Sequence, residues 1–247
     1  MGKITALDVT FELIEFLSRN GASPVKEIAR EVDRPKSTLY DHLDTLEELN
    51  YVVKEESRYR LSSRFLWIGM QARDNLRLFT IAKDDIDALA EETGEHAALY
   101  VEENGLSTML YTCAGENAIE ITQYDGMMFP SHCGAPGKMM LAHMSEEKVE
   151  EIIGEYGLPR YTENTITDRD VLFEELSKIR ERGFAFERSE HLKGVRSVAA
   201  PIVDTDQLVG AITVYGPASR FQDDYFTSVL PDQLNNTTNI IEVNYSY

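Results

Sequence analysis

The sequence has few cysteines and no long hydrophobic run. Its two cysteines, Cys113 and Cys133, are too few for a disulfide framework and are typical of a reducing cell interior. The longest apolar runs, such as 197–203 and 208–215, are far shorter than the ~20 residues that cross a bilayer. The amino terminus also lacks the apolar core of a secretion signal. We therefore expect a cytoplasmic protein that has no membrane partner.

Basic side chains are scarce, but only in one part of the chain. The sequence has 24 Lys and Arg against 43 Asp and Glu, a net charge of −19. Residues 1–80 are nearly balanced, with 12 basic and 13 acidic side chains, so the acidity lies in residues 81–247. The first part can therefore still bind nucleic acid. Excess carboxylate with few lysines is also typical of proteins in concentrated salt, and it predicts a halophilic source.

No catalytic or metal-binding constellation stands out in the sequence. Catalysis needs a nucleophile beside a base, or a metal with its ligands. His132, Cys133, His143 and His191 form only a loose collection without zinc-type spacing. We therefore expect no enzyme activity, no metal and no cofactor. A redox- or metal-responsive site made of Cys113, Cys133 and His132 is kept as an alternative.

Residues 1–62 have the pattern of a helix-turn-helix followed by a β-hairpin wing. The first of three helices is predicted to end near Gly21, and the second to begin with Ser23 as its cap and Pro24 in its first turn. Strand-like runs at 51–54 and 58–61 predict the hairpin. A helical packing unit without DNA function is the alternative. The predicted buried stripes are Leu7, Phe11, Ile14 and Leu17; Val25, Ile28, Ala29 and Val32; and Leu39, Leu43, Leu46 and Leu49.

The third helix and the hairpin carry side chains that suit DNA. Cations, hydroxyls and free amides at the helix start can contact phosphates, and Tyr40 and His42 can pack on sugars or base edges. Asp41 either accepts a hydrogen bond from a cytosine amino group or repels phosphate. The predicted DNA-binding residues are Arg34, Lys36, Ser37, Thr38, Tyr40, Asp41, His42, Lys54, Arg58 and Arg60.

Residues 63–80 are predicted to form a linker, read as one helix over 62–78. The segment has no proline and a wide apolar surface that includes Leu66, Trp67 and Met70. Because operator half-sites require a two-fold protein, we interpret this surface as a dimer seam. Packing of the helix on its own headpiece is the alternative.

Residues 81–247 alternate helix and strand patterns, which predicts an α+β domain with an antiparallel sheet. Helices are expected at 81–93, 137–144, 146–156 and 167–182 and from Asp223 onward. Strands are expected at 96–101, 108–113, 119–124, 184–187, 197–203 and 208–215.

Three stretches of this domain are candidates for a ligand site. The small-residue loop 132–138 opens onto a helix, whose free amides and dipole attract a carboxylate, and it includes Gly137. Residues 187–196 form a polar turn between two strands. Ser197, Thr213 and Tyr215 alternate along a strand pair and are expected on one face of the sheet.

Over nearly its whole length the chain resembles the IclR-type transcription regulators, of a haloarchaeal kind. The segment 34–38 with Leu43 is similar to the family's recognition helix, and 129–142 is similar to its signature at the effector pocket. Further matches follow in order at 161–166, Gly183-Phe184, Glu190 with Gly194, Ala199-Ala200-Pro201 and Tyr215-Gly216-Pro217.

The resemblance implies a winged helix-turn-helix, a GAF-like effector domain and assembly as homodimers or dimers of dimers. Three positions depart from the family: Asp41 where Arg is frequent, Ser197 where Cys is common, and Tyr215 where smaller hydroxyls are common. By position, the family's effector pocket falls on Ala135, Pro136, Glu187, Ser197, Thr213 and Tyr215.

These observations predict a sequence-specific regulator that binds double-stranded DNA and responds to a small-molecule effector. The helix start at 132–138, together with the effectors that are usual in the family that the chain resembles, favours an organic acid or sugar acid as the effector. The alternatives are the redox- or metal-responsive regulator and a ligand-independent regulator whose pocket is filled by Tyr215.

Overall fold

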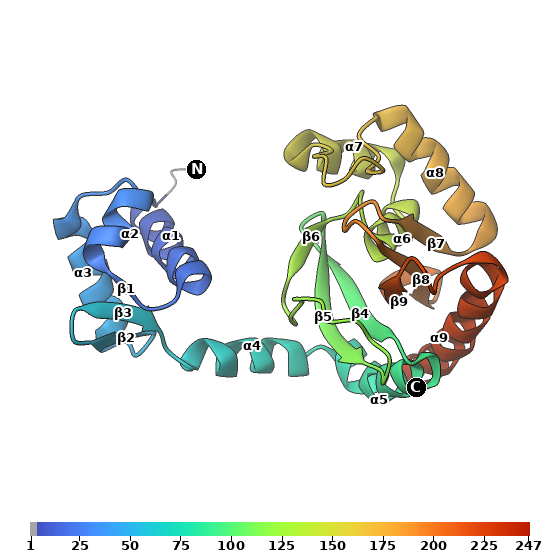
Figure 1. Ribbon diagram of the computed structural model, residues 1–247, viewed down its shortest axis with the longest axis horizontal. Helices are drawn as coiled ribbons and strands as arrows, with labels where there is room; N and C mark the ends of the chain where they lie inside the picture. Colours follow the sequence, from blue (N-terminus) through green and yellow to red (C-terminus); the bar gives the residue numbers. More distant parts are fainter. Residues whose placement is uncertain (1–3) are drawn as a thin grey trace. The chain divides into compact units, whose positions relative to one another are not determined.

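The computed structural model describes residues 4–247 and divides into two compact units, Met1–Ala72 and Arg73–Tyr247. Figure 1 shows the helices and strands of each unit. The first unit is a three-helix bundle with a small antiparallel sheet in the order β1-β3-β2. Its elements are α1 (Thr5–Asn20), β1 (Ser23–Pro24), α2 (Val25–Glu31), α3 (Lys36–Glu48), β2 (Val52–Glu55) and β3 (Arg58–Leu61).

Two of the predicted buried stripes in this unit are partly wrong. Leu7 and Phe11 are exposed, with 53% and 58% of their surface accessible, while α1 buries Val9, Leu13, Phe16 and Leu17. Both sets fit helical spacing, so only the contact with the rest of the bundle decides between them. Leu49 is also exposed, because α3 ends at Glu48.

The predicted start of the second helix is wrong as well. Ser23 and Pro24 form β1 and pair with Tyr59 and Arg58 of β3, and α2 begins only at Val25. The Ser23 hydroxyl donates to the carbonyl of Gly21 at 3.2 Å and caps no helix. Proline is tolerated in such a short edge strand because its nitrogen needs no ladder partner.

The linker is two helices, which corrects the prediction of one helix over 62–78. Helix α4 (Arg64–Asp74) ends before Asn75, and α5 (Arg77–Thr93) begins after Leu76, whose backbone is extended (φ −81°, ψ 113°). Leu78 and Phe79 of α5 are buried, whereas α4 has no buried residue.

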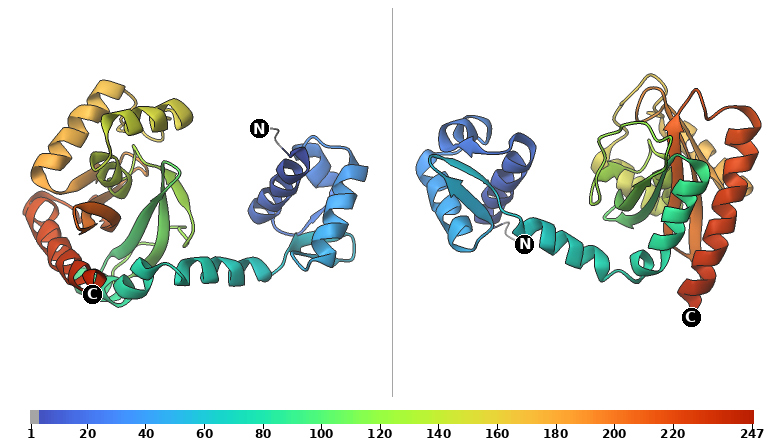
Figure 2. Two further views of the ribbon diagram at one scale, coloured as in Figure 1. Left: turned by 180° about the vertical axis from the view of Figure 1, so that it is seen from behind. Right: turned by 60° about the horizontal axis from the view of Figure 1, so that its bottom comes forward.

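The second unit is an α+β fold around one six-stranded antiparallel sheet in the order β6-β5-β4-β9-β8-β7, as predicted for its class. Helices α5 and α9 cover one face of the sheet, and α6, α7 and α8 cover the other (Figures 1 and 2). The strands are β4 (His96–Glu103), β5 (Leu106–Ala114), β6 (Met128–Pro130), β7 (Ala185–Arg188), β8 (Val195–Asp204) and β9 (Gln207–Pro217). The helices are α6 (Ala135–Ala142), α7 (Glu146–Tyr156), α8 (Arg169–Arg182) and α9 (Leu230–Ser246), the last preceded by the π-helical turn η1 (Tyr225–Val229).

The expected strand at 119–124 does not form. The outer edge of β5 is already occupied there, because the amide of Thr112 donates to the Asp125 carboxylate (3.0 Å) and the amide of Met109 donates to the carbonyl of Met127 (2.9 Å). The carbonyl of Ile119 instead pairs with the His96 ring at 2.7 Å. The edge strand is β6, in which Met128, Phe129 and Pro130 pair with Thr108, Ser107 and Leu106 of β5.

Strand alternation determines which side chains reach the face below α6. Ile212 and Val214 of β9 point to the core formed with α5 and α9. Ser197 lies opposite Tyr215, and Ala199 opposite Thr213, in the β8–β9 register. Ala199 and Tyr215 pack in the core on the α6 side. Among residues 4–247, no helix is long and apolar enough to cross a membrane.

Candidate functional site

The start of α3 presents polar side chains to solvent. Pro35 precedes the helix in an extended conformation, and no side chain caps the first turn, so its amides are available to an outside acceptor. The leucines of α3 lie on the opposite side, with Leu39 and Leu43 fully buried. The exposed predicted DNA contacts on this helix are Lys36, Ser37, Tyr40 and Asp41.

Two other predicted DNA contacts are directed at α1. The Arg34 guanidinium donates to both carboxylate oxygens of Glu12 at 3.1 and 3.3 Å. The His42 ring nitrogen Nδ1 lies 2.8 Å from the Thr10 hydroxyl. Thr38 is half-buried. Arg34 and His42 therefore connect this part of the unit to α1, which sequence spacing alone did not indicate.

The basic side chains of the wing also have partners within the unit. Arg60 donates to Glu55 at 2.6 and 2.9 Å, across the hairpin. Arg58 donates to the carbonyl of Ala22 at 2.9 Å, and the Lys54 ammonium lies 5.2 Å from the centre of the Tyr59 ring. All these contacts are on the surface, so phosphate can compete for the same cations.

A cavity that opens to solvent lies in the second unit between the sheet and the start of α6, with about 560 Å³ of empty space when its open mouth is included. Ala135 does not line it, because its side chain is fully buried in the neighbouring core. The predicted effector residues that line the cavity together are Pro136, Gly137, Glu187, Ser197, Thr213 and Tyr215. The predicted stretches 129–142 and 187–196 also bring Phe129, Pro130, Cys133, Gly134, His191, Leu192 and Val195 to the cavity wall. The lining residues that sequence reasoning missed are Tyr100, Ser107 and Gln123.

Tyr215 forms one wall of the cavity and does not fill it. Its ring stacks on the His96 ring, with centroids 4.7 Å apart and planes at 3°. Its hydroxyl lies 3.0 Å from that of Thr112. Burial raises the pKa of this hydroxyl. The ring is thus fixed from two sides, and the space beside it remains open.

Glu187 brings a buried carboxyl group to the cavity. It is 3% exposed. Its Oε1 accepts the backbone amides of Glu190 and His191, the latter at 3.3 Å, and its Oε2 accepts the Ser197 hydroxyl at 3.2 Å. Burial, which outweighs these donors, raises the pKa of Glu187 to about 7. This acid therefore changes charge close to neutral pH.

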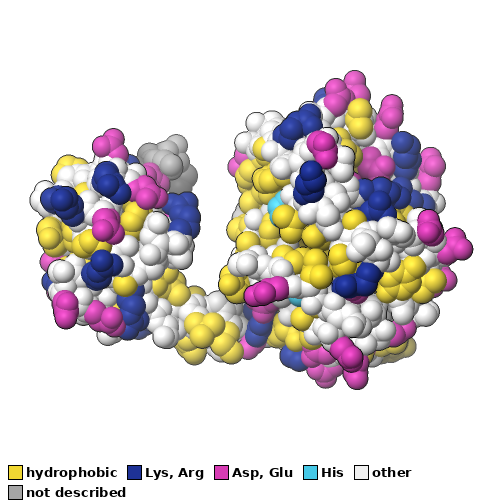
Figure 3. Space-filling model, viewed as in Figure 1, with side chains coloured by type: hydrophobic (Ala, Val, Ile, Leu, Met, Phe, Trp, Pro, Cys, Tyr) yellow, Lys and Arg dark blue, Asp and Glu magenta, His cyan; other side chains and the backbone are white. Residues whose placement is uncertain are grey.

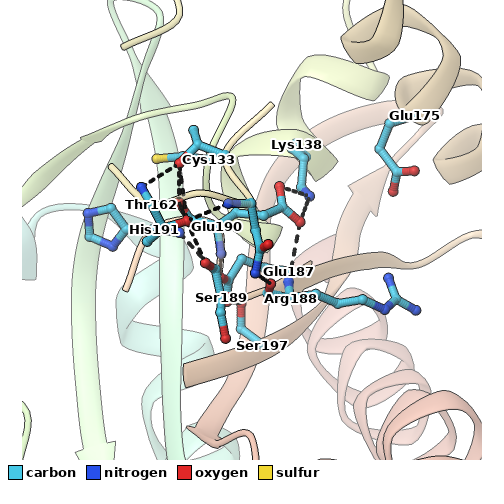
Figure 4. A network of polar contacts seen from close by, with 12 residues as sticks. Cys133, Lys138, Thr162, Glu175, Glu187, Arg188, Ser189, Glu190, His191 and Ser197 are labelled. Atoms are coloured by element: carbon cyan, nitrogen blue, oxygen red, sulfur yellow. Dashed lines mark hydrogen bonds and ion pairs between the residues drawn. The ribbon is translucent and has the colours of Figure 1, made fainter. Parts of the chain in front are cut away.

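A second buried acid, Glu190, pairs with Lys138 of α6 next to the cavity (Figure 4). The Lys138 ammonium lies 2.7 and 2.6 Å from the two carboxylate oxygens. The hydroxyls of Thr162 and Thr165 donate to the carbonyls of Ser189 and Glu190 at 2.7 and 2.6 Å. These contacts join α6, the loop after β7 and the loop before α8 into one polar network.

Two polar side chains at the cavity have buried atoms without a hydrogen-bond partner among the described residues. They are the hydroxyl of Ser107, on β5, and the Oε1 oxygen of Gln123, which follows β5. Buried polar atoms are rarely left unpaired, so a bound molecule or water is the expected partner. A lone serine or glutamine gives no signal in the sequence, which is why both were missed.

Family models match both units of the chain. The model described as "IclR helix-turn-helix domain" matches residues 6–56, and the one described as "Bacterial transcriptional regulator IclR C-terminal" matches residues 70–242. The chain belongs to the IclR family of transcription regulators. Its first unit is accordingly the DNA-binding headpiece of an IclR regulator, and its second unit is the C-terminal effector-binding domain.

Relatives of the IclR family resemble the chain along its whole length. The probable HTH-type transcriptional regulator ArcR of Halobacterium salinarum is 30% identical over 98% of this chain and 94% of its own length. The crystal structure of Thermotoga maritima IclR has a TM-score of 0.80 and 27% identity, covering 99% of this chain and 100% of that one. An IclR homologue from Microbacterium hydrocarbonoxydans, in complex with 4-hydroxybenzoate, has a TM-score of 0.82 at 21% identity, covering 97% of this chain and 98% of that one.

The two thiols of this IclR-family protein lie on opposite faces of the sheet. Cys113 packs against the core of α5 and α9, whereas Cys133 lines the cavity below α6. Burial raises the pKa of Cys133 to about 12 and also raises that of Cys113, so neither thiol is a ready thiolate. His132 is engaged with the carbonyl of Pro159 at 3.0 Å. Within residues 4–247, no group of three or more His, Cys, Asp and Glu side chains is placed to hold a metal.

Proposed function

We propose that this IclR-family regulator binds an operator in double-stranded DNA as a homodimer, and that a small organic acid in the cavity below α6 controls the binding. The effector shifts the equilibrium between DNA-binding and non-binding states because it binds one of them more tightly. The observation that carries the proposal is the cavity itself, with buried polar atoms that lack a protein partner.

The beginning of α6 supports an acid as the effector. Gly134 precedes the helix and no side chain caps it, so the amides of Ala135 and Gly137 have no side-chain acceptor, while Pro136 has no N–H to donate. Gly134 and Gly137 line the cavity, and a Cβ at Gly137 would approach the Ser131 backbone to 2.4 Å, so the close packing there requires glycine. Helix starts of this kind attract carboxylates. The Microbacterium homologue, with the same fold, holds the aromatic acid 4-hydroxybenzoate.

The exposed start of α3 supports DNA recognition by this helix. A cation, a hydroxyl and free amides are available there, and the wing adds surface cations. Fluorescence anisotropy with DNA from the gene's own upstream region, in molar KCl and against scrambled DNA, tests the proposal. A preference for the upstream sequence supports specific regulation, and equal binding to both DNAs contradicts recognition of that region.

The surface of α4 supports a homodimer. Leu66, Trp67 and Met70 are 67%, 60% and 45% exposed, and hydrophobic side chains gather over this helix in Figure 3. Contiguous exposed apolar side chains mark interaction surfaces. A two-fold partner fits operators with two half-sites, and a dimer of dimers uses the same unit twice.

The ligand-independent alternative is less well supported. It requires Tyr215 to occupy the effector site, yet the ring is held against His96 and forms only one part of the cavity wall. The redox alternative requires reactive thiols, and the raised pKa values of Cys113 and Cys133 oppose it.

A further inference from the structure

The cavity wall, as residues 4–247 form it, carries an acidic side chain but no lysine or arginine. None of its lining side chains, all within the described part of the chain, is a lysine or an arginine, and Glu187 is the one carboxyl group among them. A carboxylate effector that enters the cavity thus meets an acid and no permanently charged cation. The His191 imidazole also lines the cavity, and burial lowers its pKa, so it is uncharged at neutral pH. The first-turn amides of α6 favour the effector's charge, but they do not neutralise that of Glu187.

Lys138 does not serve as the missing cation. Its side chain is 1% exposed and is not part of the cavity wall. Both carboxylate oxygens of Glu190 already accept its hydrogen bonds, at 2.7 and 2.6 Å. The pair is therefore neutral as a unit, and it leaves no positive charge free for a ligand.

The groups that face Glu187 explain why its protonation is sensitive to a ligand. Glu190 and His191 follow β7 and donate their amides to it, and Ser197 of β8 donates its hydroxyl. Burial is the largest influence on its pKa; the charge of Glu190 raises the pKa and that of Lys138 lowers it. Cys133, before α6, has its own pKa raised by burial and by Glu187. With the pKa of Glu187 at about 7, a further negative charge nearby shifts it to higher values.

The start of α6 and Glu187 line the same cavity, so a carboxylate held at the α6 amides lies near Glu187. Charges that lie near each other in a partly buried site are only weakly screened. Two carboxylates confined together cannot both remain ionised, and they retain one proton between them.

We propose that an acidic effector enters this cavity together with one proton from the solvent, which the effector's carboxyl group and Glu187 then hold between them. This inference rests on the proposed function, because it assumes that the effector is an acid. It makes Glu187 a residue that couples effector affinity to pH. Above neutral pH the apparent Kd then rises by about tenfold per pH unit, since each binding event must take up a proton.

Isothermal titration calorimetry of the full chain tests the proposal, with 4-hydroxybenzoate and gluconate as probes. Titrations at about pH 8 are run in two buffers of different ionisation enthalpy, and repeated at about pH 5.5. We expect uptake of about one proton per bound acid at the higher pH and almost none at the lower pH, where Glu187 is already protonated. Because proton uptake is measured on the wild-type chain, this test does not depend on whether a variant folds.

The variant Glu187→Gln provides the matched comparison. Its side chain keeps an acceptor for the amides of Glu190 and His191 but cannot ionise. We expect its affinity for the acid to be independent of pH, and its binding enthalpy to be the same in both buffers. Wild-type binding without proton uptake at pH 8 overturns the shared proton and leaves the acid effector standing. The absence of binding by either acid at either pH overturns the acid class and the proton with it.

Discussion

The buried ammonium of Lys138 lies between both carboxylate oxygens of Glu190, at 2.7 and 2.6 Å, and connects α6 to the loop that follows β7. Glu190 also accepts the amide of Arg188 at 3.2 Å, and Thr165 donates to its carbonyl. One ion pair thus positions two of the segments that border the effector cavity.

Removing one member of this pair is expected to be strongly destabilising. Lys138→Met leaves Glu190 as an uncompensated buried charge, at a cost of ~3–5 kcal/mol in the free energy of unfolding. The double variant Lys138→Met, Glu190→Gln removes the charge as well and should recover more than half of that loss. Urea unfolding at neutral pH measures both. A single variant as stable as the wild type contradicts the role of the pair.

Glu187 is expected to make stability depend on pH. Its pKa is about 7 in the folded chain, above the ordinary glutamate value of 4.5, so the folded state binds the extra proton between these values. Stability therefore falls as the pH rises from 4.5 to 7, by about 3 kcal/mol at 1.36 kcal/mol per pKa unit. Glu187→Gln should gain stability over the wild type at pH 8 and little at pH 4.5. Chemical unfolding of both proteins across this pH range measures the effect. If the unfolding free energies of the two proteins change in parallel with pH, Glu187 is not the cause of the pH dependence.

Tyr215 is expected to limit the size of the effector. Tyr215→Ser removes the ring that stacks on His96, which enlarges the cavity and costs ~3–4 kcal/mol of stability, as large-to-small changes in cores do. Tyr215→Phe keeps the ring and loses only the contact with the Thr112 hydroxyl, at ~1 kcal/mol. We expect the serine variant to accept bulkier acids in calorimetry and the phenylalanine variant to bind as the wild type does. If only the serine variant bound acids at all, the ligand-independent alternative would be favoured.

DNA binding is expected to depend on Lys36 more than on Arg34. Lys36 is exposed at the start of α3, whereas Arg34 is held by Glu12. Lys36→Ala should weaken binding and lower the slope of log affinity against log salt by about one. Arg34→Ala should have a smaller effect, and Lys193→Ala, an exposed cation of the second unit, serves as the charge-matched control. Anisotropy titrations over a range of KCl measure these slopes, and equal losses for Lys36→Ala and Lys193→Ala would argue against contact by α3.

The sequence predicts the elements well where local chemistry determines them. Helix α7 has the expected bounds, because the Ser145 hydroxyl accepts the amide of Lys148 and Gly157 supplies a positive φ at its end. The prediction fails where two patterns fit equally, as on α1, or where distant groups compete, as at 119–124. Part of the cavity wall follows from strand alternation on β8 and β9. Ser107 and Gln123 reach it because the fold brings β5 and the segment after β5 to the cavity, which no local pattern reports.

The apolar face of α4 is expected to hold two copies of the chain together. Trp67→Glu places a charge on a side chain that is 60% exposed, so the folded chain should keep its stability while the dimer loses apolar contact. Ala72→Glu adds the same charge at an exposed position on the opposite side of the helix and is the control. Light scattering on purified proteins should show a dimer for the wild type and for Ala72→Glu, and a monomer for Trp67→Glu. A dimer that survives Trp67→Glu places the two-fold contact on another surface, because a buried glutamate without a partner is too costly to retain in an interface.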